Sequence, residues 1–178
     1  MLMISRAVRT ASLLAAVSFA SAVAAAGAGA QEVTRSGDAA LAREVGSARV
    51  SLARGLSAAS ARGKPISGKY ELEDGKLQLS VYTEKGGKFW EVIVDHDAGR
   101  VTKAEEITGG EDLTAARSQS EAMAKATRFL SAAVARALRA NPGYRAVSVT
   151  PSVDNGRAVA TIRLARRTSA KSVSEPLN

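Results

Sequence analysis

The sequence predicts an α+β fold built from two units, each a helix followed by an antiparallel meander of strands, with the helices packed on the sheet. The apolar period changes from three and four residues to two after Lys64. Two-residue turn signals then appear at Asp74-Gly75 and, later, at Asn155-Gly156. The order helix, break, strand, turn, strand occurs twice, the second time in shorter form. We therefore expect one full unit and one truncated copy, and leave open whether they share one core or form a tandem pair.

The first 30 residues have the organisation of a secretory signal peptide. Arg6 and Arg9 precede an Ala-rich apolar stretch, which ends in the small residues 28–30 of a cleavage site. We therefore expect a protein of the periplasm or the cell exterior, with residues 31–37 as a flexible leader. No later segment is long and apolar enough to span a bilayer, so the cleaved chain is not expected to be an integral membrane protein.

The first unit is expected to cover residues 38–108. Asp38 can cap a helix whose apolar stripe reaches Ala59, and Gly63 lies just beyond its end. Four short strands follow, because polar and apolar residues alternate between turn signals, and the last strand covers residues 101–107. One face of this meander is apolar and needs a cover, for which the preceding helix is the obvious candidate.

The second unit is expected to cover residues 111–165. A helix ends before Asn141-Pro142-Gly143, and strands follow at 144–149 and 158–164. This copy lacks a counterpart of the third strand, which predicts an open sheet edge at 158–164 where a partner's strand could be added. Residues 166–178 are polar and are expected to form a flexible tail.

One run in the first unit, residues 90–101, carries the most distinctive pattern of the chain. Its tryptophan and two valines alternate along a strand and bury one face. An aspartate at the strand end can accept hydrogen bonds from turn amides, and the glycine after it suits a positive-φ position. The residues that we assign this structural role are Trp90, Val92, Val94, Asp95, Gly99 and Val101.

Together with the helix and hairpin before it, this run makes residues 51–107 resemble a PepSY domain. Asp95, Gly99 and Val101 fall on the most characteristic positions of that family, while His96 replaces a small residue. The resemblance implies a non-enzymatic domain, of a kind found in peptidase propeptides and in secreted stand-alone proteins. It further implies that the chain inhibits or regulates a peptidase of the cell envelope.

The residue inventory argues against catalysis and cofactors. The chain has no cysteine and one histidine, which excludes a thiol nucleophile and any site built on paired histidines. Asp95-His96-Asp97 could be read as metal ligands or as a base with its orienting carboxylate. Neighbouring strand residues point to opposite faces, however, so a strand end followed by a polar turn is the better interpretation. We therefore expect no enzyme, no metal and no cofactor.

Charge is distributed unevenly along the chain. Residues 31–116 carry 12 basic and 14 acidic side chains, whereas residues 117–178 carry 11 basic and 3 acidic ones, nine of the basic ones being arginine. This surplus suggests either an anionic partner or simply a solvated surface. Nucleic acid is not expected, since the chain carries an export signal and no groove-reading motif. The residues predicted for partner binding are Arg145, Arg157, Ile162 and Arg163.

These features favour an exported, non-enzymatic PepSY-like binding or regulatory module that docks on an envelope protein, with a peptidase as the partner class. The alternative is an Arg-rich periplasmic protein that binds an anionic surface or polymer of the envelope.

Overall fold

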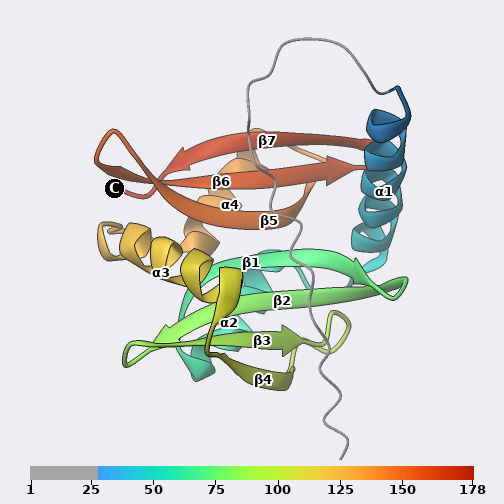
Figure 1. Cartoon of the computed structure of the whole chain (residues 1–178). Helices are drawn as coiled ribbons and strands as arrows, with labels where there is room; N and C mark the ends of the chain where they lie inside the picture. Colours follow the sequence, from blue (N-terminus) through green and yellow to red (C-terminus); the bar gives the residue numbers. More distant parts are fainter. Residues whose placement is uncertain (1–27) are drawn as a thin grey trace, which may run out of the picture.

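The alternating residues after Lys64 form a seven-stranded antiparallel sheet with helices on both faces, which confirms the predicted α+β class (Figure 1). The computed structural model describes residues 28–178, so most of the predicted signal peptide lies outside the described residues. The helices are α1 (Ala28–Ser47), α2 (Leu52–Ala59), the 3-10 turn η1 (Ser60–Arg62), α3 (Gly110–Ala124) and α4 (Leu130–Ala140). The strands are β1 (Lys64–Glu73), β2 (Lys76–Lys85), β3 (Lys88–Val94), β4 (Val101–Ile107), β5 (Arg145–Asp154), β6 (Arg157–Arg166) and β7 (Ser169–Pro176).

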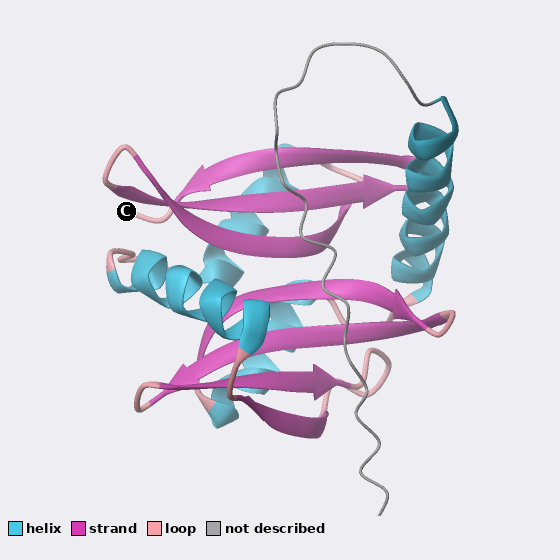
Figure 2. Cartoon of the chain, viewed as in Figure 1, coloured by secondary structure: helices cyan, strands magenta, loops and turns pink. Residues whose placement is uncertain are grey.

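The two units share one sheet and one core. The strand order is β4-β3-β2-β1-β5-β6-β7, so the units meet where β1 pairs with β5 through Gly68↔Val149 and Lys69↔Ser148. Helices α2 and α4 lie together on one face, α3 crosses the opposite face, and α1 runs across the strands at one end of the sheet (Figures 1 and 2). Apolar side chains of both units form a single buried cluster.

Two equivalent hairpins support the predicted internal repeat. The β1–β2 turn has φ of 49° at Asp74 and 74° at Gly75, and the β5–β6 turn has φ of 47° at Asn155 and 80° at Gly156. Two consecutive positive φ angles define the type I′ turn, whose twist matches that of the flanking strands. The same type of turn therefore joins the first two strands of each unit.

The second unit is longer than expected, which corrects two predictions. Residues 169–176 form β7, paired with β6 along its whole length, where a flexible tail 166–178 is predicted. The second unit thus has a third strand and lacks only a counterpart of β4. Strand β7 is not predicted from the sequence for two reasons. The turn between β6 and β7 has Arg167, not glycine, at a φ of 56°, and the strand itself is mostly polar. Its pairing also makes β6 an interior strand.

Both predicted long helices are divided, and the predicted leader is helical. Helix α1 runs through residues 31–37, where the sequence predicts a flexible leader; the segment contains no proline to end the helix. The first division lies at residues 48–51, where the hydroxyl of Ser51 caps α2 by accepting from the Arg54 N–H at 3.2 Å. The second lies between α3 and α4, where the N–H groups of Thr127 and Arg128 donate to the Leu177 carbonyl at 2.9 and 3.0 Å.

Helix α2 packs very closely on the sheet because of one glycine. A Cβ at Gly55 would lie 2.5 Å from Cδ2 of the fully buried Leu79 on β2. This close approach brings Leu52 and Leu56 into the core and places the first turn of α2 beside the start of β5.

Candidate binding cleft between the two units

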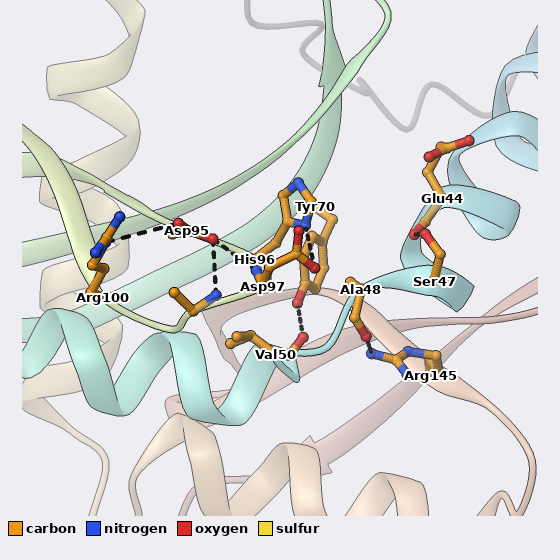
Figure 3. A network of polar contacts seen from close by, with 11 residues as sticks. Glu44, Ser47, Ala48, Val50, Tyr70, Asp95, His96, Asp97, Arg100 and Arg145 are labelled. Atoms are coloured by element: carbon orange, nitrogen blue, oxygen red, sulfur yellow. Dashed lines mark hydrogen bonds and ion pairs between the residues drawn. The ribbon is translucent and has the colours of Figure 1, made fainter.

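The turn after β3 has the backbone geometry that the sequence suggests for Asp95 and Gly99. One carboxylate oxygen of Asp95 accepts from the N–H groups of Asp97 and Ala98, both at 2.9 Å (Figure 3). These two bonds hold the pKa of Asp95 below its usual value. Gly99 has φ of 74° and donates to the Asp95 carbonyl at 2.8 Å. Val92 and Val94 are buried upstream of this turn, and Trp90 and Val101 are half-buried against the same core.

His96 uses its backbone in this turn. Its carbonyl accepts from the Val50 N–H at 2.8 Å, while its ring nitrogen Nδ1 lies 3.7 Å from a carboxylate oxygen of Asp97. Within residues 28–178, no three acidic or histidine side chains are grouped as a metal ion would require. Through the hydrogen bond from Val50 to the His96 carbonyl, the turn after β3 holds the segment between α1 and α2.

That segment, residues 48–51, is the α1–α2 joint, and three other elements hold its backbone. The β3–β4 turn binds Val50 as described, the Tyr70 hydroxyl donates to the Val50 carbonyl, and the Arg145 guanidinium donates to the Ala48 carbonyl at 2.7 Å (Figure 3). Burial raises the pKa of Tyr70 to about 12, and the nearby charge of Arg145 opposes that shift. The joint is thus fixed from both units of the fold.

The four residues predicted for partner binding do not form one surface. Ile162 is fully buried in the interior strand β6, so the predicted open edge at 158–164 is wrong. Arg163 forms an ion pair with Asp38 of α1, and Arg157 is exposed beside the β5–β6 turn. Arg145 lines a concave site, described below.

The true sheet edges, β4 and β7, are poorly suited to strand addition. Strand β4 exposes Lys103, Glu105 and Glu106, and β7 carries Lys171 and ends at Pro176. Charged side chains and proline are the usual means by which proteins prevent pairing at an edge. A docking mode through side chains is therefore better supported than one through the sheet edge.

Arg145 lies in a cleft at the seam between the units, which we call the arginine cleft. It has a volume of about 410 Å³ and is open to solvent. Its wall includes the α1–α2 joint, the first turn of α2, the end of α4 and the start of β5. The lining residues that matter here are Arg49, Arg54, Arg145, Leu52, Leu138 and Tyr144.

The charge in this cleft is uncompensated. Arg49 and Arg54 are exposed and form no ion pair with a side chain of residues 37–178, and no aspartate or glutamate is among the described lining residues. The positive surface continues past Tyr144, where the Arg166 guanidinium lies 4.9 Å and the Lys171 ammonium 4.5 Å from the ring centroid. The arrangement can attract an anionic group.

A second, smaller hollow of about 100 Å³ lies on the other face, between α3 and β1. We call it the α3 pocket, and most of its polar groups bind one another. Lys69 pairs with Glu71 at 2.6 Å, and the Ser67 hydroxyl donates to Gln119 at 2.6 Å. Tyr82 donates to Glu91 at 3.2 Å. Burial raises the pKa of both groups of this last pair.

Asp112 is the exception in the α3 pocket. One of its carboxylate oxygens is buried without a hydrogen-bond partner, and burial raises the pKa of the group. Lys69 opposes this shift by its charge. Apart from this oxygen, the polar groups described for the pocket bind one another.

Sequence reasoning missed Arg49 and Arg54. They belong to residues 31–116, where acidic side chains outnumber basic ones, so the net charge of that segment gives no sign of a local group of arginines. Arg145 joins them only through the pairing of β1 with β5 and the packing of α2 beside α4. The one local signal is the spacing of two arginines around the helix-capping Ser51.

Comparison with known proteins assigns no family to the chain. No protein-family model matches it, and no curated protein does. A crystal structure described as a putative lipoprotein from Clostridium difficile 630 is 12% identical, with a TM-score of 0.39, over 72% of this chain and 95% of that one. A likeness at this level carries no inference. Within the part of the chain that the structure describes, no helix is long and apolar enough to cross a membrane.

Proposed function

We propose that the protein is an exported, non-enzymatic binding module that docks on another protein of the cell envelope through the arginine cleft. The observation that carries the proposal is the cleft itself: Arg49 and Arg54, on either side of the helix-capping Ser51, and the distant Arg145 line one hollow with no acidic residue among its described lining residues. Unpaired charges contribute little to folding, but they steer and hold a partner of opposite charge. The PepSY resemblance of residues 51–107 supports the same class of function and makes a peptidase the first partner to test.

Placement of the cleft also supports a binding role. Its walls come from both units, so a partner bound there contacts the α1–α2 joint, whose backbone three other elements hold by hydrogen bonds. Rigid surroundings lower the entropy that binding has to overcome. The sheet edges lack this advantage and carry charges that discourage pairing.

The alternative function, binding to a polyanionic envelope component, draws on the arginine surplus as a whole. Two of the nine arginines in residues 117–178 are already paired within the fold, Arg163 with Asp38 and Arg136 with Glu175 at 2.9 Å. The surplus is therefore less available than the sequence suggests. This observation favours a localised site over a diffuse basic surface.

The test is a crosslinking pull-down from the envelope fraction of the source cells, at low salt and at ~0.5 M salt to screen surface charges. Three proteins are compared: the natural chain, an Arg49→Gln/Arg54→Gln variant, and an Arg117→Gln/Arg157→Gln control of equal net charge. We expect one envelope protein to be retained by the natural chain and the control at low salt and lost from the cleft variant. At ~0.5 M salt, retention by the natural chain and the control should weaken, because the cleft arginines are exposed. Retention of polymer alone, or equal loss from both variants, contradicts the proposal.

A captured peptidase allows a direct assay of regulation. Its activity is measured with and without added natural chain, and we expect inhibition that the cleft variant does not produce. Unchanged peptidase activity removes the regulatory part of the proposal and leaves the docking function.

A further inference from the structure

We infer that the arginine cleft binds an acidic peptide segment, with a carboxylate between the arginines and an adjoining apolar side chain against Leu138 and Tyr144. This inference names the partner chemistry of the site in the proposed function, and rests on that function for the source of the segment.

The charges of the cleft point to an anion. The fold gives Arg136 and Arg163 acidic partners, Glu175 and Asp38, but most of its arginines have none among the described side chains. What distinguishes the cleft is that Arg49 and Arg54, without an ion pair to a described residue, line one hollow together with a third arginine. Like charges held in one hollow repel one another, and an entering anion converts that repulsion into attraction.

The third arginine of the cleft, Arg145, is already held in position by the fold. Arg145 is half-buried and one of its terminal N–H groups donates to the Ala48 carbonyl at 2.7 Å. A guanidinium has five N–H donors in a planar fork, so the remaining donors stay available to a second acceptor. A carboxylate matches the spacing of that fork and can accept two parallel hydrogen bonds.

The apolar part of the wall favours a peptide over a charged polymer. Leu138 and Tyr144 are half-buried and expose apolar surface in the wall, whereas Leu52 is 1% exposed and offers almost none. A volume of about 410 Å³ is in the range of sites that enclose small organic groups. A sugar or phosphate polymer could use the arginines but would leave this apolar surface uncovered.

The direction of the segment follows from the neighbouring cations. Arg166 and Lys171 both lie over Tyr144, so positive charge continues from the cleft toward the β6–β7 turn. A segment with a second acidic residue on that side of its apolar residue fits this track.

The test is isothermal titration of the natural chain with a capped peptide of sequence Gly-Asp-Leu-Glu-Leu-Gly, and with its amide analogue Gly-Asn-Leu-Gln-Leu-Gly. Inorganic phosphate and a polyphosphate are titrated separately. The same titrations are repeated with Arg49→Gln/Arg54→Gln and with the equal-charge control Arg117→Gln/Arg157→Gln, after circular dichroism has shown that both variants are folded.

We expect the acidic peptide to bind the natural chain and the control alike, and to lose about tenfold or more in affinity with the cleft variant. The amide analogue and inorganic phosphate should bind about tenfold more weakly than the acidic peptide, or not measurably. Equal weakening by both variants, or binding of polyphosphate without binding of the acidic peptide, overturns the inference.

The two proposals fail separately. If the pull-down identifies a partner that the cleft variant still retains, the docking function stands and the assignment of the cleft is wrong. If the peptide binds in the cleft while no envelope protein is captured, the cleft chemistry stands and the proposed function is wrong.

Discussion

The arginine cleft and the α3 pocket lie on opposite faces of the sheet, both where the two units meet. They differ in whether their charged side chains have partners within the fold. In the α3 pocket, Lys69 pairs with Glu71 and Tyr82 with Glu91, so the polar groups are largely satisfied from within. In the arginine cleft, Arg49 and Arg54 lack ion-pair partners in the described chain.

This difference separates polar groups that support the fold from those available to a partner. A satisfied, half-buried network stabilises its own surroundings and gains little from a ligand. An unpaired surface charge contributes almost nothing to stability, so its removal should leave the fold intact and affect only binding. Variants in the two regions should therefore have opposite consequences.

The largest expected effect concerns the position of α2, which carries Arg54 into the cleft. Gly55→Ala places a methyl group 2.5 Å from Cδ2 of the buried Leu79, and should cost about 1–3 kcal/mol in the free energy of unfolding. Urea unfolding measures the loss, and binding of the acidic peptide should weaken because α2 is displaced.

Gly46→Ala in α1 is the matched control. A Cβ at Gly46 meets nothing within 4 Å, so alanine should stabilise the helix by up to ~1 kcal/mol. If both alanine variants change stability in the same direction, the close packing of α2 is not what the glycine provides.

A smaller effect is expected at the α1–α2 joint. Tyr70→Phe removes the hydrogen bond to the Val50 carbonyl and should cost about 1 kcal/mol near neutral pH. Because burial raises the folded-state pKa of Tyr70 to about 12, its contribution is complete below the unfolded value of 10.0 and is lost as pH rises through the folded value. Urea unfolding at several pH values between 8 and 12 should show the two proteins converging.

Burial also raises the pKa of Tyr82, which is present in both the natural chain and the Tyr70→Phe variant. The difference in stability between these two proteins therefore reports on Tyr70 alone. A constant difference in stability between the two proteins across that pH range would mean that ionisation of Tyr70 does not loosen the joint.

The smallest effect is expected in the α3 pocket. Lys69→Met removes the ion pair with Glu71, whose side chains are 26% and 32% exposed, and should cost less than about 1 kcal/mol. Thermal unfolding measures this cost, while affinity for the acidic peptide should stay unchanged. If Lys69→Met loses as much affinity for the peptide as the cleft variant does, the peptide binds in the α3 pocket and its assignment to the arginine cleft is wrong.

Local chemistry made part of this molecule predictable from sequence. The turns at Asp74-Gly75 and Asn155-Gly156 were identifiable because a type I′ turn needs two positive φ angles, which few residue pairs adopt easily. The turn at Arg167 uses the same region of φ without glycine, and therefore β7 was missed.

Long-range contacts account for what the sequence did not reveal at the candidate site. Arg145 and Arg49 are brought together by the pairing of β1 with β5 and by a hydrogen bond to the backbone of residue 48, neither of which has a local signature. The division between α3 and α4 likewise depends on the distant Leu177 carbonyl. Periodicity reports which face of an element is buried, but not which distant element covers it.

The most direct test of the contrast between the two regions is a nuclear magnetic resonance titration of the natural chain with the acidic peptide. The side-chain Nε–H signals of Arg49, Arg54 and Arg145 report on the cleft, and the backbone signals of Ser67, Tyr82 and Gln119 report on the α3 pocket. Our account predicts saturable shifts of the three arginine signals while the pocket signals stay in place. Shifts confined to the pocket, or spread evenly over exposed arginines such as Arg117 and Arg157, would contradict it.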